Sequence, residues 1–288
     1  MIRGARECKT ADFILTTLLE FMMEHIKITK DLPIGFMDSG LGGLSVLQQA
    51  VRIMPEEDFI YYGDSANAPY GTKPQEEIRR LTFNVVEKLL DMGIKGLAVA
   101  CNTATSAAVR LLREKYTDLP IVGIEPAIKP AVEENHGGQI VVMATPMTIA
   151  QEKYHKLLDK YRGDKEIVSI PCAGLMEFVE EGDLNGDDLD KYFEEHLVPY
   201  LSDNLETIVL GCTHYPFVRP HLRAFLNNPS VNIIDGSVGT SKELMRRLDE
   251  KGLLKKDTGR KGTIKIMNSS GTEEMIKRSE KLLKMPVD

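Results

Sequence analysis

The sequence predicts an α/β protein with two pseudo-symmetric lobes, each a largely parallel sheet flanked by helices. Short apolar runs alternate with amphipathic stretches from residue 33 to about residue 250. Such alternation is typical of βαβ units on parallel sheets. Two of the apolar runs, 97–100 and 208–210, are each followed by a cysteine and small polar residues. With 288 residues, 42% of them hydrophobic, the chain can bury the cores of two lobes.

The first half of the chain contains four predicted strands, each a short apolar run that ends in a polar or glycine-containing turn. These strands are expected at 33–37, 59–62, 97–100 and 120–124. Helical patterns lie between them, one opening at Gly42-Gly43 and two more spanning 75–92 and 104–116. The order of elements predicts one parallel sheet with crossover helices.

The second half shows the same alternation of predicted strands and helices, without a strict sequence repeat. Strands are expected at 139–144, 166–170, 206–210 and 231–234, and helices at 148–161, 173–182, 187–203 and from about Thr240. Pro126, Pro130 and Gly137-Gly138 cluster between the halves, as at a lobe boundary. We therefore expect an N-terminal extension (1–30), a first lobe (31–125 plus 236–288) and a second lobe (126–235).

The N-terminal extension differs in character from the rest of the chain. Basic residues precede the apolar run 13–19, which faintly resembles a secretory signal. However, Asp12 and Glu20 flank this run, and no cleavage site of small residues follows it. Apolar residues at 14, 18, 21 and 22 predict one face of a short helix. The alternative is that Met23 is the true first residue.

Composition excludes several classes of function. The net charge of −7 argues against a nucleic-acid-binding protein, which would carry an excess of basic residues. No apolar run is long enough to span a bilayer. The four cysteines form no CxxC pair, which argues against a zinc site or a dithiol redox site, and they are too few for a disulfide scaffold. These features favour a cytoplasmic enzyme.

Two of the cysteines lie where ligands bind in open α/β sheets, outside the carboxyl ends of strands. The two motifs are Cys101-Asn102-Thr103 and Cys212-Thr213-His214. A buried core cysteine is the plainer interpretation of each alone. The polar neighbours favour a site, because they can bind a carboxylate and because a histidine can activate a thiol. Two opposed thiols could invert a stereocentre.

The remaining cysteines lack such neighbours. Cys172 follows Ile170-Pro171 and is interpreted as a core residue, and Cys8 lies in the extension.

The turn Asp38-Ser39-Gly40-Leu41-Gly42-Gly43 follows the first strand. It can bind an anion through backbone N–H groups, although a tight structural turn explains the glycines equally well. The turn is not a P-loop, because no Gly-Lys-Ser/Thr follows, and it lacks the spacing of GxGxxG. Asp38 favours a functional turn, because a carboxylate at a strand's end can act as a base or orient one.

Five motifs in order resemble the glutamate racemases, within the cofactor-independent aspartate/glutamate racemase superfamily. The resemblance runs from about residue 33 to 250 and is carried by GFMDSGLGG (35–43), YYGD (61–64), APYG (68–71), ACNTAT (100–105) and GCTHYP (211–216). It implies two α/β lobes with the active site in the cleft between them. It also implies a two-base mechanism, in which Cys101 attacks D-glutamate and Cys212 attacks L-glutamate.

The resemblance further implies roles for the neighbours of the two cysteines. Asp38 and His214 would assist catalysis beside Cys101 and Cys212, and Glu180, or Glu181 if the alignment slips by one, would add a carboxylate. The substrate would be bound by Asp38, Ser39, Tyr70, Gly71, Asn102, Thr103, Thr213 and His214. No metal or pyridoxal phosphate is expected. The resemblance also implies a homodimer, a role in supplying D-glutamate for peptidoglycan, and, in some relatives, activation by a cell-wall nucleotide precursor.

Three alternatives remain at this point. An aspartate racemase would use the same pair of cysteines. However, aspartate racemases of this superfamily resemble the pattern Gly-Cys-Thr-Glu at the second cysteine, and His214 occupies the place of that glutamate here. A cysteine hydrolase using Cys212 and His214 leaves Cys101 unexplained and predicts an acyl-enzyme. A two-lobed binding protein predicts binding with both cysteines dispensable.

Overall fold

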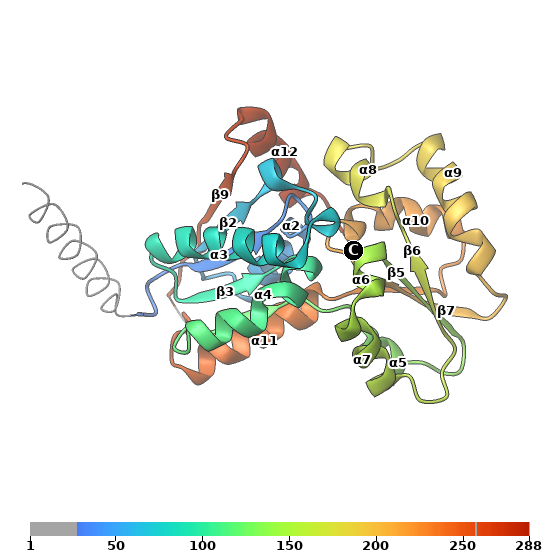
Figure 1. Ribbon diagram of the computed structural model, residues 1–288, viewed down its shortest axis with the longest axis horizontal. Helices are drawn as coiled ribbons and strands as arrows, with labels where there is room; N and C mark the ends of the chain where they lie inside the picture. The colour runs from blue at the N-terminus through green and yellow to red at the C-terminus, as the bar shows by residue number, and fades with distance from the viewer. Residues whose placement is uncertain (1–27, 257, 288) are drawn as a thin grey trace, which may run out of the picture.

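Two parallel sheets form the frame of the molecule (Figure 1). The computed structural model describes residues 28–256 and 258–287, so the predicted N-terminal helix lies outside the described residues. The five-stranded sheet has the order β4-β3-β1-β2-β9 and contains β1 (Ile34–Asp38), β2 (Phe59–Gly63), β3 (Gly96–Val99), β4 (Ile121–Gly123) and β9 (Ile264–Asn268). The four-stranded sheet has the order β6-β5-β7-β8 and contains β5 (Gln139–Ala144), β6 (Ile167–Pro171), β7 (Leu205–Leu210) and β8 (Asn232–Asp235). The predicted α/β class with parallel sheets is confirmed.

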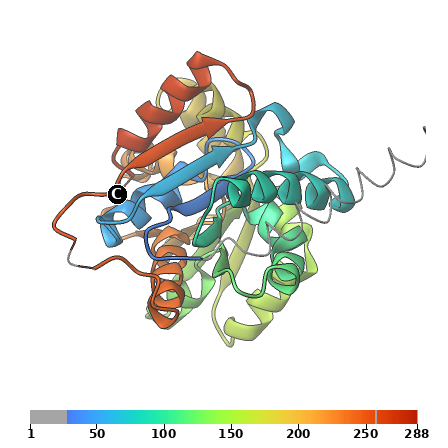
Figure 2. The same ribbon diagram turned by 90° about the vertical axis from the view of Figure 1, so that its left-hand side faces the viewer.

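Helices cover both faces of the five-stranded sheet (Figures 1 and 2). They are α2 (Leu44–Ile53), α3 (Gln75–Asp91), α4 (Asn102–Lys115), α11 (Ser237–Glu250) and α12 (Glu273–Lys284). Successive strand residues face opposite sides, so Phe36 packs in the core beneath α2 and α11, whereas Met37 packs in the core beneath α3 and α4. Burial on both faces explains why these strands are continuous apolar runs.

The four-stranded sheet is covered in the same way. Its helices are α5 (Ile128–Glu133), α6 (Pro146–Ala150), α7 (Glu152–Tyr161), α8 (Leu175–Glu181), α9 (Asp187–His196) and α10 (Arg219–Leu226). Short 3-10 turns complete the connections: η1 (Ser65–Asn67), η2 (Tyr70–Thr72), η3 (Val198–Tyr200) and η4 (Tyr215–Val218). None of the helices in the described ranges is long and apolar enough to cross a membrane.

Two predicted helices are shorter in the structure than in the sequence pattern. The stretch 148–161 is divided into α6 and α7 by Gln151, whose backbone is extended. The stretch 187–203 ends at His196, and the 3-10 turn η3 with Pro199 follows. Proline has no N–H to continue a helix, which explains this early end.

The chain crosses between the sheets twice, once after β4 and once after β8. The last strand, β9, pairs in parallel with β2, and α12 packs on α2. We therefore propose the lobe division 31–125 plus 236–288 and 126–235, because each sheet then lies within one lobe. The sequence pattern predicted neither β9 nor α12.

Candidate functional site

A cavity of about 220 Å³ lies where the carboxyl ends of strands from both sheets meet. The first lobe lines it with residues that follow β1 and β3 and with the loop around Tyr70. The second lobe lines it with residues that follow β5, β6 and β7. All predicted site residues except Asp38 and Glu180 line this cavity, including both Cys101 and Cys212. The cavity thus brings together two thiols from opposite lobes.

Cys101 forms the start of helix α4. Its Sγ accepts a hydrogen bond from the Ala104 N–H at 3.4 Å and lies 3.3 Å from the Ser39 hydroxyl oxygen. The positive end of a helix favours a thiolate at this position. Burial and, next, the charge of Asp38 nevertheless raise the pKa of Cys101 to about 12, against the opposing hydrogen bonds from Ser39 and Ala104. These surroundings therefore favour the thiol form of Cys101.

Asp38 lies behind the cavity wall, fully buried at the end of β1. Its Oδ2 accepts the Gly40 N–H at 2.9 Å, whereas Oδ1 has no hydrogen-bond partner among the described residues. Burial raises the pKa of Asp38, although the His214 charge and the backbone N–H groups of the turn oppose this. An unpartnered buried carboxyl oxygen is costly, which suits a group that meets a cation or a proton during function.

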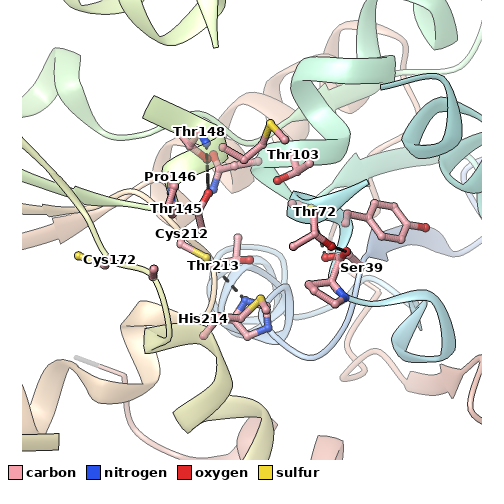
Figure 3. A pocket seen from close by; sticks show the side chains of 18 of the residues that line it. Ser39, Thr72, Thr103, Thr145, Pro146, Thr148, Cys172, Cys212, Thr213 and His214 are labelled. Atoms are coloured by element: carbon pink, nitrogen blue, oxygen red, sulfur yellow. Dashed lines mark hydrogen bonds between the residues drawn. The ribbon is translucent and has the colours of Figure 1, made fainter. Parts of the chain in front are cut away.

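Cys212 is the first member of a chain of three polar side chains. Its Sγ lies 3.7 Å from Nδ1 of His214 (Figure 3). Nε2 of His214 lies 2.7 Å from Oε1 of Glu180. Burial alone lowers the pKa of His214, but the bonds to Cys212 and Glu180 and their charges raise it well above its ordinary value. A protonated His214 favours the Cys212 thiolate.

Glu180, and not its exposed neighbour Glu181, contacts His214. Burial raises the pKa of the Glu180 carboxyl, but the bond and charge of His214, the Leu41 N–H and the Arg278 charge together hold it below its ordinary value. The carboxylate therefore stabilises the imidazolium next to Cys212.

The glycines of the turn 38–43 let the lobes approach closely. A Cβ on Gly40 would lie 2.4 Å from Oε1 of Glu180, and a Cβ on Gly42 would lie 2.4 Å from Nδ1 of His214. Close packing of the backbone on the second lobe thus requires glycine at both positions. Ser45, just after the turn, donates a hydrogen bond to the Thr213 carbonyl at 2.8 Å.

The predicted binding residues surround the space between the thiols. Asn102, Thr103 and Thr213 present polar groups to the cavity. Oδ1 of Asn102 is buried and finds no hydrogen-bond partner in the described part of the chain. Tyr70 lines the cavity beside Gly71, and its hydroxyl donates to Asp64 at 2.6 Å.

Sequence reasoning missed several cavity residues on the second lobe. Thr145 and Thr148 follow β5, and their hydroxyl oxygens lie 2.9 Å apart (Figure 3). Cys172, predicted as core, is indeed buried, yet it also lines the cavity. Applying the strand-end rule to 139–144 and 166–170 would have found both sites. Within 28–256 and 258–287, no cluster of His, Cys, Asp or Glu is arranged to hold a metal ion.

Comparison with known proteins identifies relatives over most of the chain. Residues 34–238 match the Asp/Glu/Hydantoin racemase family. A glutamate racemase of Clostridium novyi is 55% identical over 258 residues, which cover 89% of this chain and 98% of that protein. A Francisella tularensis glutamate racemase solved in complex with D-glutamate has a TM-score of 0.75 at 30% identity, covering 89% of this chain and 95% of that chain.

A third relative is known with an activator. It is the Escherichia coli glutamate racemase, solved in complex with L-glutamate and the activator UDP-MurNAc-Ala, with a TM-score of 0.73 at 26% identity. The match covers 86% of this chain and 95% of that chain.

Two lobes that enclose a cavity with Cys101 on one side and Cys212 on the other, together with these matches, define a racemase of the Asp/Glu/Hydantoin racemase family. Within this family, the chain belongs to the glutamate racemases.

Proposed function

We propose that the protein interconverts L- and D-glutamate by a two-base mechanism. The observation that carries this proposal is that Cys101 and Cys212 line one small cavity from opposite lobes. Two like groups suit a reaction whose substrate and product are mirror images, because each must act as acid and as base. Structures of relatives with D-glutamate and with L-glutamate support the choice of substrate.

In the direction from L- to D-glutamate, the Cys212 thiolate takes the α-proton from one face. The Cys101 thiol then donates its proton to the opposite face of the carbanionic intermediate, which leaves Cys101 as thiolate and Cys212 as thiol. The opposite direction reverses both transfers. The protonated Cys101 and the His214 cation beside Cys212 favour the state that accepts L-glutamate.

The remaining residues stabilise the charge that develops on the substrate. We assign Ser39, Asn102, Thr103 and Thr213 to the substrate carboxylates and ammonium, with Tyr70 and Gly71 at the cavity wall. Asp38 assists Cys101, because its buried carboxyl group lies close enough for its charge to raise the pKa of the Cys101 thiol. A preorganised donor at a developing anion is worth about 2.7–4 kcal/mol.

We also propose the cellular setting that the relatives suggest. The D-glutamate would supply peptidoglycan biosynthesis in the cytoplasm, and the enzyme would act as a homodimer without a cofactor. An activating cell-wall nucleotide is a further candidate partner, since the Escherichia coli relative was solved with UDP-MurNAc-Ala.

Circular dichroism of protein incubated with L- or D-glutamate tests the reaction. We expect the signal to decay toward zero from either enantiomer, and we expect Cys101→Ala and Cys212→Ala to abolish the decay. L- and D-aspartate provide the competing substrates. Decay of aspartate alone would make the enzyme an aspartate racemase. A trapped acyl-enzyme would indicate a hydrolase, and glutamate binding without decay would indicate a binding protein.

A further inference from the structure

Arg278 connects the C-terminal helix of the first lobe to the catalytic side of the second lobe. It lies on α12, and its guanidinium donates a hydrogen bond to the backbone carbonyl of Glu180 on α8. It also pairs with Glu274 one turn earlier on α12, at 3.1 Å. Figure 1 shows the two helices facing each other across the top of the two lobes.

The acceptor of this bond lies in the last turn of α8, where carbonyls lack helical donors. The backbone N–H groups of Asp183 and Gly182 bond to the carbonyls of Phe178 and Val179. The Glu180 carbonyl instead takes the Arg278 guanidinium, a cation suited to the end of a helix. Arg278 thus fixes the backbone that carries the Glu180 carboxylate.

Helix α12 is itself held in place by hydrogen bonds to helix α2. The side-chain amide of Gln48, on α2, donates to the carbonyls of Leu282, Leu283 and Met285 at 2.7, 3.1 and 2.9 Å. Gln48 follows closely on the glycine turn that packs against Glu180 and His214. Both contacts of Glu180 with the first lobe, from Leu41 and from Arg278, therefore come from one packed unit.

We propose that Arg278 is a positioning residue for the Cys212 half of the reaction, holding Glu180 from the opposite lobe so that its carboxylate stays on His214. This inference rests on the proposed two-thiol racemisation. Arg278 acts through Glu180 and His214 and does not line the substrate cavity.

The sign of the pH effect follows from the groups that face His214 and Glu180. These groups are Cys212 from the end of β7, Asp38 from β1, the Tyr61 hydroxyl from β2 and Arg278 from α12. Removing the Arg278 cation makes Glu180 easier to protonate, which moves the acid limb of the kcat/KM profile to higher pH. A weaker Glu180 anion also holds the His214 proton less well, which moves the basic limb to lower pH.

The first experiment compares Arg278→Met with Lys277→Met. Both variants lose an ion pair to the residue four positions earlier on α12, but only Arg278 reaches Glu180. We expect Arg278→Met to lose about tenfold in kcat/KM, as for one charge-assisted hydrogen bond, and to show a narrowed pH profile. Lys277→Met should keep the wild-type profile, and Arg278→Lys should restore part of the loss.

A double-mutant cycle separates positioning from a purely structural role. In a protein that already carries Glu180→Gln, Arg278→Met should lower kcat/KM by a smaller factor, because the carboxylate that Arg278 positions through the Glu180 backbone is gone. A helix-end contribution to stability alone would persist in that background, since the Glu180 carbonyl remains. Thermal unfolding of all variants shows which of them are folded.

Isotope effects report which thiol is affected. Slowing the Cys212 step should raise the isotope effect for α-deuterated L-glutamate and lower it for α-deuterated D-glutamate. If folded Arg278→Met matches Lys277→Met in rate, pH profile and isotope effects, the inference is wrong while the racemase function stands. If the wild-type protein does not racemise glutamate, the proposed function itself fails.

Discussion

The charge on Glu180 sets the protonation of His214, and this link can be tested at a single atom. Glu180→Gln keeps a side chain near Nε2 of His214 but removes the anion that raises the histidine pKa. The pKa of His214 should then fall, so the imidazolium is lost at lower pH. We expect the basic limb of the kcat/KM profile to move to lower pH and activity at neutral pH to fall about 10–100-fold.

Glu181→Gln is the matched control. It removes the same formal charge from the neighbouring position, but the Glu181 carboxylate is exposed. Its pH profile should match that of the unchanged protein. Equal shifts from both variants would show that net charge, and not the contact with His214, sets the profile.

At Gly42 the backbone lies close to the imidazole of His214. In Gly42→Ala, the added Cβ would lie 2.4 Å from Nδ1 of His214 and 2.6 Å from Oγ1 of Thr213. Since side chains cannot approach so closely, His214 or the turn must shift, which disturbs the contact of His214 with Cys212, and racemisation should fall at least about tenfold. Racemisation rates and thermal unfolding measure the outcome.

Gly239→Ala is the control for this substitution. Gly239 lies inside α11, and no atom is near its added Cβ. Alanine there should leave activity unchanged and stabilise the protein by about 0.5–1 kcal/mol. Full activity in Gly42→Ala would contradict the requirement for glycine at the lobe contact.

The sequence predicted cavity residues best where an unusual side chain marked the end of a strand. Cys101 and Cys212 stand out in this way, and both line the cavity. Thr145 and Thr148 do not, because threonine after a strand is also an ordinary helix cap. The contact of Glu180 with His214 joins positions 34 residues apart, and no local pattern reports such a contact.

Helix α12 carries its own start signal, although the sequence analysis left this segment unassigned. Thr272 Oγ1 accepts the Met275 N–H at 3.3 Å, and acidic residues occupy the first turn. Thr272→Ala should therefore cost about 1 kcal/mol of unfolding free energy, measured in urea. Thr272→Ser keeps the acceptor and should lose little. Equal stability of the two variants would show that the side-chain cap does not stabilise this helix.

Helix ends and the added strand show what limits prediction at the level of elements. Amphipathic spacing predicted 148–161 as one helix, since the extended backbone at Gln151 leaves the apolar spacing nearly unchanged. The strand β9 is exposed at its start and only partly buried after that, and Lys265 interrupts its apolar residues, so it lacks the continuous apolar run of a buried strand. Its position follows from pairing with β2, which is a tertiary contact.

At the scale of the molecule, alternating strands and helices predicted the α/β class and parallel sheets because connections of this kind leave a strong local pattern. The strand order did not follow from that pattern. It depends on which strand edges pair, as when β9, which follows the whole second lobe in the sequence, pairs with β2.

Hydrogen exchange with and without glutamate tests whether substrate draws the lobes together. The cavity is walled by segments of both lobes, and the Ser45 bond to Thr213 and the Leu41 bond to Glu180 already join them on one side. We would use a Cys101→Ala/Cys212→Ala protein, which lacks both thiols of the proposed reaction and should therefore leave the ligand as a single enantiomer. We expect D-glutamate to slow exchange at 38–43, 101–104, 145–148 and 212–214, because closing around charged substrate excludes water from both walls.

The amino ends of β1 and β7, at the far side of the sheets, serve as internal controls, and their exchange rates should not change. Protection confined to one lobe at saturating glutamate would mean that substrate binds without closure, and catalysis would then depend on a preformed cavity.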